Sequence, residues 1–264
     1  MTETAVAPEG GVRDREATPA SRPARLVAVA SGKGGVGKTW LSITLAHALA
    51  RSGAGVLLFD GDLGLANVDV QLGLAGGRDV GPLLAGVAPL EDCVQTSAAG
   101  FAVLAGSSGT GTFSALPDAT IDRLAAVLAG ARGYSHVLLD LGAGLDRTVR
   151  RMAATAATLL VVTTDEPTAL TDAYAALKLA THDKPGGDRR IVVNLAASRA
   201  AGERTYATLA KACEKFLGAR PPLAGIIRRD PRVPEAIRRQ TPLLTRHPHS
   251  EAAADVSALA RALL

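Results

Sequence analysis

Seven short apolar runs recur along the chain, and they constrain its fold more than any other feature of the sequence. Each is six or seven residues long and almost continuously apolar, which is typical of strands covered on both faces of a sheet. Stretches with a helical pattern lie between several of them, at residues 38–51, 118–129, 167–182 and 203–217. The runs themselves are residues 26–31, 55–60, 101–106, 136–141, 158–164, 190–195 and 223–228.

This alternation of strand and helix predicts an α/β fold, with a doubly wound, mostly parallel sheet flanked by helices. Hydrophobic residues make up 47% of the chain but aromatic residues only 3%, so we expect a core of Ala, Val, Leu and Ile. A chain of 264 residues suits one large domain, which we place at residues 25–264. Residues 1–24 are rich in Pro, Gly, Ala, Thr and charge, and we expect a disordered tail there.

The bulk properties exclude several classes of protein. The apolar runs are too short to span a bilayer, which takes about 20 residues, and the start is polar, so we expect a cytoplasmic protein. Cys93 and Cys213 stand far apart without a CxxC pattern, which argues against a metal cluster or a disulfide framework. The net charge of +4 permits contact with nucleic acid or an anionic membrane but does not argue for either.

The stretch SGKGGVGKTW, residues 31–40, contains a phosphate-loop pattern between a predicted strand and a predicted helix. Its glycines let backbone N–H groups surround phosphate oxygens, and the helix N-terminus adds its positive end. Lys38 is expected to reach the β- and γ-phosphates, and the Thr39 hydroxyl to bind Mg²⁺. A chance glycine-rich turn is the alternative, which this setting disfavours. The expected nucleotide contacts in the loop are Gly32, Gly34, Gly35, Val36, Gly37, Lys38, Thr39 and Trp40.

Three carboxylates follow predicted strands, and the carboxyl ends of strands are where ligands bind in open α/β sheets. Asp60 and Asp62 are spaced to point the same way, so they are able to orient an attacking water and position a metal. The alternative is a pair of loop carboxylates that caps residues 63–69. Asp140 ends the run HVLLD, where it is able to hold the hydration shell of Mg²⁺.

These residues together resemble the deviant phosphate-loop ATPases of the MinD/ParA group, whose mark is KGGVGKT with a signature lysine, here Lys33. The likeness runs from about Arg25 to the end and is greatest to the flagellar-number regulators of the FlhG (FleN) branch. It rests on SGKGGVGKT, DGDLGLANVDVQLGL, DLGAGL, TTDEPTALTDAYAALK, VVNLAASRAAGERTYATLAKACEKFLG and IIRRDPRVPEAIRRQ.

The resemblance implies a P-loop fold, ATP or ADP with Mg²⁺ as cofactors, and a role for each matched residue. Two subunits would close face to face around two ATP molecules, and each Lys33 would reach the phosphates held by the other subunit. By the same resemblance, Asp62 would orient the attacking water, Asp60 would be its partner near the metal, and Asp140 would hold the hydration shell of the magnesium ion. Asn194 would contact the edge of the adenine, and the loop around Arg229 and Asp230 would close over the base.

The implied function is a slow ATPase switch that regulates flagellar number or placement. Its expected partners are the flagellar GTPase FlhF, flagellar switch components or a transcriptional activator, with recruitment to the cell pole or inner membrane surface. The alternative is a ParA-type cargo or chromosome partitioning ATPase that binds DNA nonspecifically. An iron–sulfur carrier is disfavoured because the chain has no CxxC. DNA contact would use a basic cluster of Arg228, Arg229, Arg232, Arg238 and Arg239.

The chain departs from its relatives in several places. VRDREATPASR does not match the DQAxxLR-type segment with which relatives stimulate FlhF, and Arg228 and Asp165 stand where proline is common. The C-terminal stripe with Val256, Leu259 and Leu263 has one Arg and no aromatic residue, so we expect a helix packed on its own domain and weak or absent membrane contact. Trp40, the only tryptophan, replaces a small polar residue; its indole lies against the ribose or base, or packs as core.

Overall fold

The computed structural model describes residues 23–62, 66–106 and 116–264. Residues 1–22 of the predicted tail lie outside the described residues, and so do residues 107–115. Residues 63–65, at the start of the segment that Asp60 and Asp62 would cap in the alternative interpretation, also lie outside them. The first strand, β1, begins at Arg25, the residue at which we placed the start of the folded domain.

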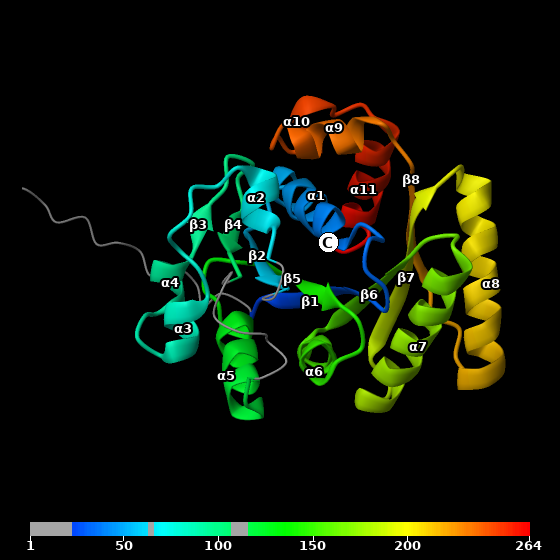
Figure 1. The fold of residues 1–264 in the computed structure, drawn as a ribbon, viewed down its shortest axis with the longest axis horizontal. Coiled ribbons are helices and arrows are strands. Elements are labelled where there is room, and N and C mark those ends of the chain that lie inside the picture. Colours follow the sequence, from blue (N-terminus) through cyan, green and yellow to red (C-terminus); the bar gives the residue numbers. More distant parts are fainter. Residues whose placement is uncertain (1–22, 63–65, 107–115) are drawn as a thin grey trace, which may run out of the picture.

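One sheet of eight strands is built from the described chain (Figure 1), and its pairings are parallel except the one between β3 and β4. From one edge to the other it consists of β3 (Gln95–Thr96), β4 (Ala102–Leu104), β2 (Val56–Gly61), β5 (His136–Ala143), β1 (Arg25–Ser31), β6 (Thr158–Thr163), β7 (Asp188–Ala196) and β8 (Leu223–Arg228). The predicted mostly parallel sheet is therefore confirmed, and each of the seven apolar runs overlaps a strand.

Helices cover both faces of the sheet, as the near-continuous apolar runs predict. One face carries α5 (Asp118–Ala129), α6 (Arg147–Thr155), α7 (Pro167–Asp183) and α8 (Arg199–Leu217), with α3 (Gly81–Ala85) and α4 (Leu90–Cys93) beside them. The other carries α1 (Lys38–Arg51), α9 (Arg232–Arg238), α10 (Leu243–Arg246) and α11 (Glu251–Arg261), with α2 (Val68–Leu72) near α1.

The two hydrophobic cores follow directly from the alternation of side chains along each strand. In the central strand β1, Leu26 and Ala28 belong to the core under α5–α8, whereas Val27 and Val29 belong to the core under α1 and α11. The strand is thus buried on both faces, as suits its place between β5 and β6 in the sheet. The loop that follows it is held on a rigid base.

Two local features differ from the prediction. Helix α8 begins at Arg199, four residues before the predicted start at 203, because Ser198 caps it by accepting a hydrogen bond from the Ala201 amide. Position 202 in this helix requires glycine, because a Cβ there would lie 2.3 Å from the side chain of Ile226 in β8. Strand β3 was not predicted, since a two-residue edge strand leaves no apolar run to find.

The last helix packs on its own domain, as predicted. The side chains of Val256, Leu259 and Leu263 are at most 1% exposed and belong to the core beneath α1. Across the described stretches of the chain, none of the helices combines the length and apolarity that crossing a bilayer requires.

Candidate functional site

The loop from Gly32 to Gly37 joins the central strand β1 to helix α1. Gly35 and Gly37 adopt left-handed backbone angles, with φ of 81° and 88°, which side chains rarely tolerate. Gly37 is also the N-cap of α1, and no side chain caps the helix there. The first amides of α1 are therefore open to an anionic ligand, and the helix dipole favours one.

Close packing on two sides holds the loop in this shape. A Cβ at Gly32 would lie 2.3 Å from the carbonyl oxygen of Asp172 in α7, so only glycine fits there. A Cβ at Gly37 would lie 2.5 Å from the side-chain nitrogen of Asn194, at the end of β7. That nitrogen donates a hydrogen bond to the Val36 carbonyl at 2.8 Å. Asn194 thus reaches the loop directly, and its buried amide oxygen has no hydrogen-bond partner among the described residues.

Lys38, the first residue of α1, is buried with its side chain close to two carboxylates. Burial lowers the pKa of Lys38, and the charges of Asp140 and Asp62 partly offset this effect. A buried cation at the start of a helix attracts negative charge strongly because little water screens it. The structure therefore supports a phosphate contact for this lysine.

Asp140 and Asp60 occupy matching positions on the adjacent strands β5 and β2. Burial raises the pKa of Asp140 to about 7, and repulsion from Asp60 adds to the shift, while hydrogen bonds from Thr39 and Ser42 oppose it. The Ser42 hydroxyl donates to Oδ1 of Asp140 at 3.0 Å. Two buried carboxylates beside the Thr39 hydroxyl form a set of oxygen donors that suits Mg²⁺.

The carboxylate of Asp60 also closes the loop that follows it. It accepts hydrogen bonds from the amides of Asp62, Asn67 and Val68, at 3.2, 2.9 and 3.0 Å. Burial raises the pKa of Asp60 to about 6 even though these three bonds lower it. Asp60 therefore holds the start of α2, as the alternative capping role predicts in part. It also lies next to Asp140 on the adjacent strand.

Asp62 lies between the loop and the strand end of β5. A Cβ added to Gly142 would lie 3.4 Å from Oδ1 of Asp62, and the Asp62 charge acts on Lys38. The carboxylate is thus near the position that a terminal phosphate would take against Lys38. The predicted role of Asp62 in orienting an attacking water stays a prediction.

Lys33 points to α7 and not to the carboxylates of its own site. Its Nζ lies 2.7 Å from Oε2 of Glu166, the N-cap residue of α7, and 2.8 Å from Oγ1 of Thr168. The hydrogen bond and charge of Lys33 lower the pKa of Glu166, and the charge of Arg229 contributes further. Glu166 is therefore paired with Lys33, and the Arg229 charge is near enough to act on the same carboxylate.

A family model of the CobQ/CobB/MinD/ParA nucleotide-binding domain matches residues 27–243. The chain belongs to this family. The antiactivator FleN of Pseudomonas aeruginosa is 35% identical over 240 residues, which cover 90% of this chain and 86% of FleN. The flagellum site-determining protein YlxH of Helicobacter pylori is 30% identical over 196 residues, or 74% of this chain and 66% of YlxH.

Among solved structures, the MinD cell division protein of Aquifex aeolicus matches with a TM-score of 0.74 at 23% identity, covering 91% of this chain and 96% of that one. The MinD of Pyrococcus horikoshii, solved as a complex with Mg-ADP, matches with a TM-score of 0.73 at 24% identity, covering 91% and 96%. At these identities the match concerns the fold. The predicted P-loop fold and the predicted likeness to MinD, ParA and FleN are confirmed.

The residues of this MinD/ParA-type domain fit a magnesium nucleotide. The open amides at the start of α1 and the buried Lys38 suit phosphates, and Thr39, Asp60 and Asp140 supply oxygen donors for the metal. The unpartnered amide oxygen of Asn194 is able to accept from an exocyclic amine. A donor set of this kind is hard, anionic and oxygen-rich, as Mg²⁺ prefers.

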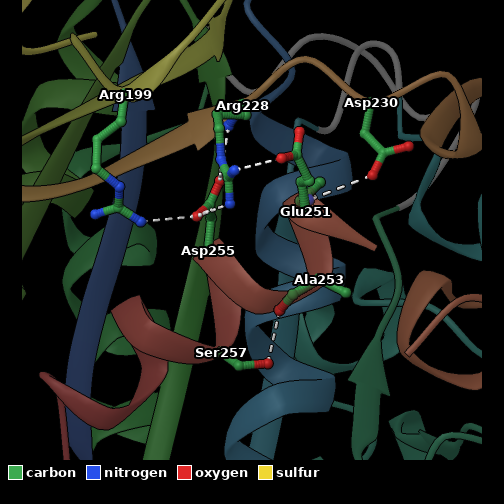
Figure 2. A network of polar contacts seen from close by, with 8 residues as sticks. Arg199, Arg228, Asp230, Glu251, Ala253, Asp255 and Ser257 are labelled. Carbon is green, nitrogen blue, oxygen red and sulfur yellow. Dashed lines mark hydrogen bonds and ion pairs between the residues drawn. The ribbon is translucent and has the colours of Figure 1, made fainter. Parts of the chain in front are cut away.

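The segment after β8 is less available for a ligand than the sequence suggested. The Asp230 side chain is buried and accepts a hydrogen bond from the Arg232 amide at 2.9 Å. It accepts another from the Ala252 amide, in the first turn of α11, at 3.3 Å (Figure 2). Burial alone would raise the pKa of Asp230, but these hydrogen bonds and one from Ser250 bring it below its ordinary value. Arg229 is exposed and near Glu166, so its side chain is free to meet a ligand.

Trp40 lies with the core under α1, and the residue is only 7% exposed. Its ring nitrogen is buried and has no hydrogen-bond partner among the described residues. The backbone of Trp40 belongs to the open first turn of α1. The burial of the ring agrees with the core alternative, and its N–H is a buried donor with no partner among the described residues.

Three residues of the site were missed by sequence reasoning. Glu166 and Thr168 bind Lys33 from a position more than 130 residues away, and Ser42 binds Asp140 from within α1. Ser42 carries a usable signal, since it follows Thr39 by one helical turn and so shares its face. No comparable signal marks Glu166, because an acidic residue before a helical proline usually serves only the helix N-terminus.

Proposed function

We propose that the protein is an ATP-dependent dimerising switch that hydrolyses ATP slowly and regulates flagellar number or placement. The observation that carries the proposal is Lys33, a loop lysine directed to Glu166 at the rim of the site and not to the carboxylates around Lys38. A lysine held at the rim suits contact with a second subunit. The 35% identity to FleN over 90% of the chain supports the flagellar part.

Each residue has a role in this proposal. Bound Mg-ATP supplies the phosphoanhydride bond and the divalent charge. The loop amides and Lys38 hold the phosphates, and Thr39, Asp60 and Asp140 hold the metal and its water shell. Asp62 orients the attacking water, and Lys33 adds positive charge to the phosphates of the partner subunit. Slow turnover is expected because the output is a change of partner.

The proposed partners are a second copy of this chain, bound with ATP, and then FlhF, flagellar switch components or a transcriptional activator. The proposed location is the cytoplasm, with recruitment to a cell pole or the inner membrane surface through such a partner. Direct membrane contact is expected to be weak, since the apolar stripe of α11 is buried in the core.

Replacement of Asp62 tests the proposal. Asp62→Ala is expected to keep ATP affinity, lose hydrolysis and accumulate as an ATP-bound dimer, measured by light scattering after gel filtration. Asp69→Ala, which removes a neighbouring carboxylate in α2, is the matched control and should behave as wild type. An Asp62→Ala protein that stays monomeric in saturating ATP would contradict the assignment of Asp62.

A ParA-type role in DNA partitioning is the second candidate. It is favoured by four exposed arginines on and around α9, namely Arg229, Arg232, Arg238 and Arg239. Arg228 is not available to DNA in the same way, because it is paired with Asp255 and Glu251. Tight ATP-dependent DNA binding at physiological salt, falling steeply as salt rises, would favour this role over the flagellar one.

A further inference from the structure

A buried aspartate in the last helix holds the end of the last strand. Asp255 of α11 has a side chain only 1% exposed, and it accepts from Arg228 at the end of β8 three times (Figure 2). The bonds come from the Arg228 amide at 3.1 Å, from Nε at 2.8 Å and from Nη2 at 3.0 Å. Arg199 adds a fourth bond from α8, at 3.2 Å. Both the backbone and the side chain of Arg228 are therefore fixed by one carboxylate.

The next two residues of the same segment are also tied down. The Arg229 amide donates to the Ala196 carbonyl at 2.8 Å, two residues after Asn194 in the chain. The Asp230 carboxylate accepts from Ala252, in the first turn of α11. Residues 228–230 thus have their path set by α11 on one side and by the end of β7 on the other.

This segment lies on the side of the phosphate loop that the nucleoside must occupy. The carboxylates Asp60, Asp62 and Asp140 lie on the side of β2 and β5, where they suit the metal and the terminal phosphate. A nucleotide with its phosphates in the loop therefore extends its base the other way, toward β7 and β8. Asn194, with its unpartnered buried oxygen, and the exposed Arg229 are on that side.

We propose that Asp255 is a positioning residue for the nucleoside half of the site, acting through Arg228 on Arg229. The inference rests on the proposed ATP-binding function. Without the Asp255 carboxylate, Arg228 loses its partner at the point where β8 ends, and Arg229 keeps only its amide bond to Ala196 and the contacts of Asp230 to hold it beside Asn194. The phosphate loop itself is anchored elsewhere, by α7 at Gly32 and by Asn194 at Gly37, so it keeps its shape.

The test compares two ligands, of which only one has a base. Asp255→Asn, of nearly the same size, is expected to weaken Mg-ATP binding roughly 3- to 30-fold. Binding of magnesium tripolyphosphate, which reaches only the loop, should not change. Arg228→Gln should reproduce this split and keeps the test valid if Asp255→Asn does not fold. Asp255→Glu should restore part of the ATP affinity, because it retains the charge. Calorimetry measures both ligands.

Two control variants separate positioning from loss of stability. Arg199→Gln removes the other arginine on Asp255 without touching residues 228–230, and Asp183→Asn breaks a comparable Arg–Asp pair with Arg150 on the opposite face. Both should bind ATP as wild type does. Equal losses of affinity for ATP and tripolyphosphate, or unchanged ATP affinity in Asp255→Asn and Arg228→Gln, would overturn this inference and leave the proposed ATP-binding function standing. Wild-type protein that binds neither ligand would overturn the proposed function and this inference with it.

Discussion

The Nζ of Lys33 lies 2.7 Å from Oε2 of Glu166, so the loop after β1 and the start of α7 are joined within a single chain. The pair is at the rim of the site, with the lysine side chain 36% and the glutamate side chain 62% exposed. A lysine that contacts a second subunit has to leave this partner or share it. In the proposed two-subunit model the ion pair would therefore oppose dimerisation, but weakly, since exposed pairs contribute little.

Glu166→Gln is expected to lower the protein concentration at which the ATP-bound dimer forms, by less than about tenfold. Lys33→Gln, in contrast, should prevent ATP-dependent dimerisation and hydrolysis, because it removes the charge that reaches the partner's phosphates. Analytical ultracentrifugation in saturating ATP measures both. Asp165→Asn, which alters the exposed neighbouring carboxylate, is the control for Glu166. Normal dimerisation and turnover of Lys33→Gln would show that the two-subunit model is wrong.

Lys38→Ala is expected to weaken ATP binding by about two orders of magnitude, because a charged hydrogen bond to phosphate is lost from a buried position. Lys178→Ala, an exposed lysine on α7, should leave affinity unchanged. Calorimetric titration with Mg-ATP measures both. Retained affinity in Lys38→Ala would place the phosphates away from the start of α1.

The fold was predictable because the central strands β1, β2, β5 and β6 are buried on both faces, and this burial appears in the sequence as near-continuous apolar runs. The bounds predicted for α1 and α5, residues 38–51 and 118–129, are those of the structure. The start of α8 was not, since it depends on the Ser198 cap and on the space that Gly202 leaves for Ile226. The Ser198 cap is a local signal that the helical pattern at 203–217 left out, whereas the contact of Gly202 with Ile226 is tertiary and has no local pattern.

The candidate site likewise contains residues whose arrangement the sequence predicts and contacts that it does not. That Lys38, Thr39 and Asp140 lie together was predictable, because strand ends of a parallel sheet meet at one edge and the phosphate loop follows the central strand. The contact between Lys33 and Glu166 depends on how α7 packs beside the loop, which the sequence does not state. The buried Asp255, whose charge is balanced by arginines from two other elements, is hidden for the same reason.

Trp40 gives an optical readout of the site, because it is the only tryptophan. Its indole is buried and its ring nitrogen lacks a hydrogen-bond partner in the described part of the chain. We expect Mg-ATP to change the intensity and wavelength of its emission as the first turn of α1 takes up phosphate. Trp40→Phe, which retains an aromatic ring, should keep most of the protein's stability and lose the signal. An unchanged spectrum with binding confirmed by calorimetry would assign the ring to the core alone.

Asp140→Asn is expected to stabilise the nucleotide-free protein at pH 8 while it weakens magnesium binding. Burial raises the pKa of Asp140 to about 7, above its value in the unfolded chain, so the folded state binds the extra proton. The resulting stability is present at low pH and is lost as pH rises through about 7. Asparagine removes this loss, which amounts to roughly 2–4 kcal/mol of unfolding free energy at pH 8.

Thermal denaturation without nucleotide, at pH values between 5 and 8, measures the difference between Asp140→Asn and wild type. The difference should grow with pH. His47, whose pKa burial lowers to about 4 with help from the charge of Arg51, is common to both proteins, so its contribution cancels. With Mg-ATP bound, the metal's charge replaces the proton, and wild type should become the more stable protein. A constant difference across this range would mean that Asp140 is ionised throughout and that Thr39, Ser42 and Lys38 outweigh its burial.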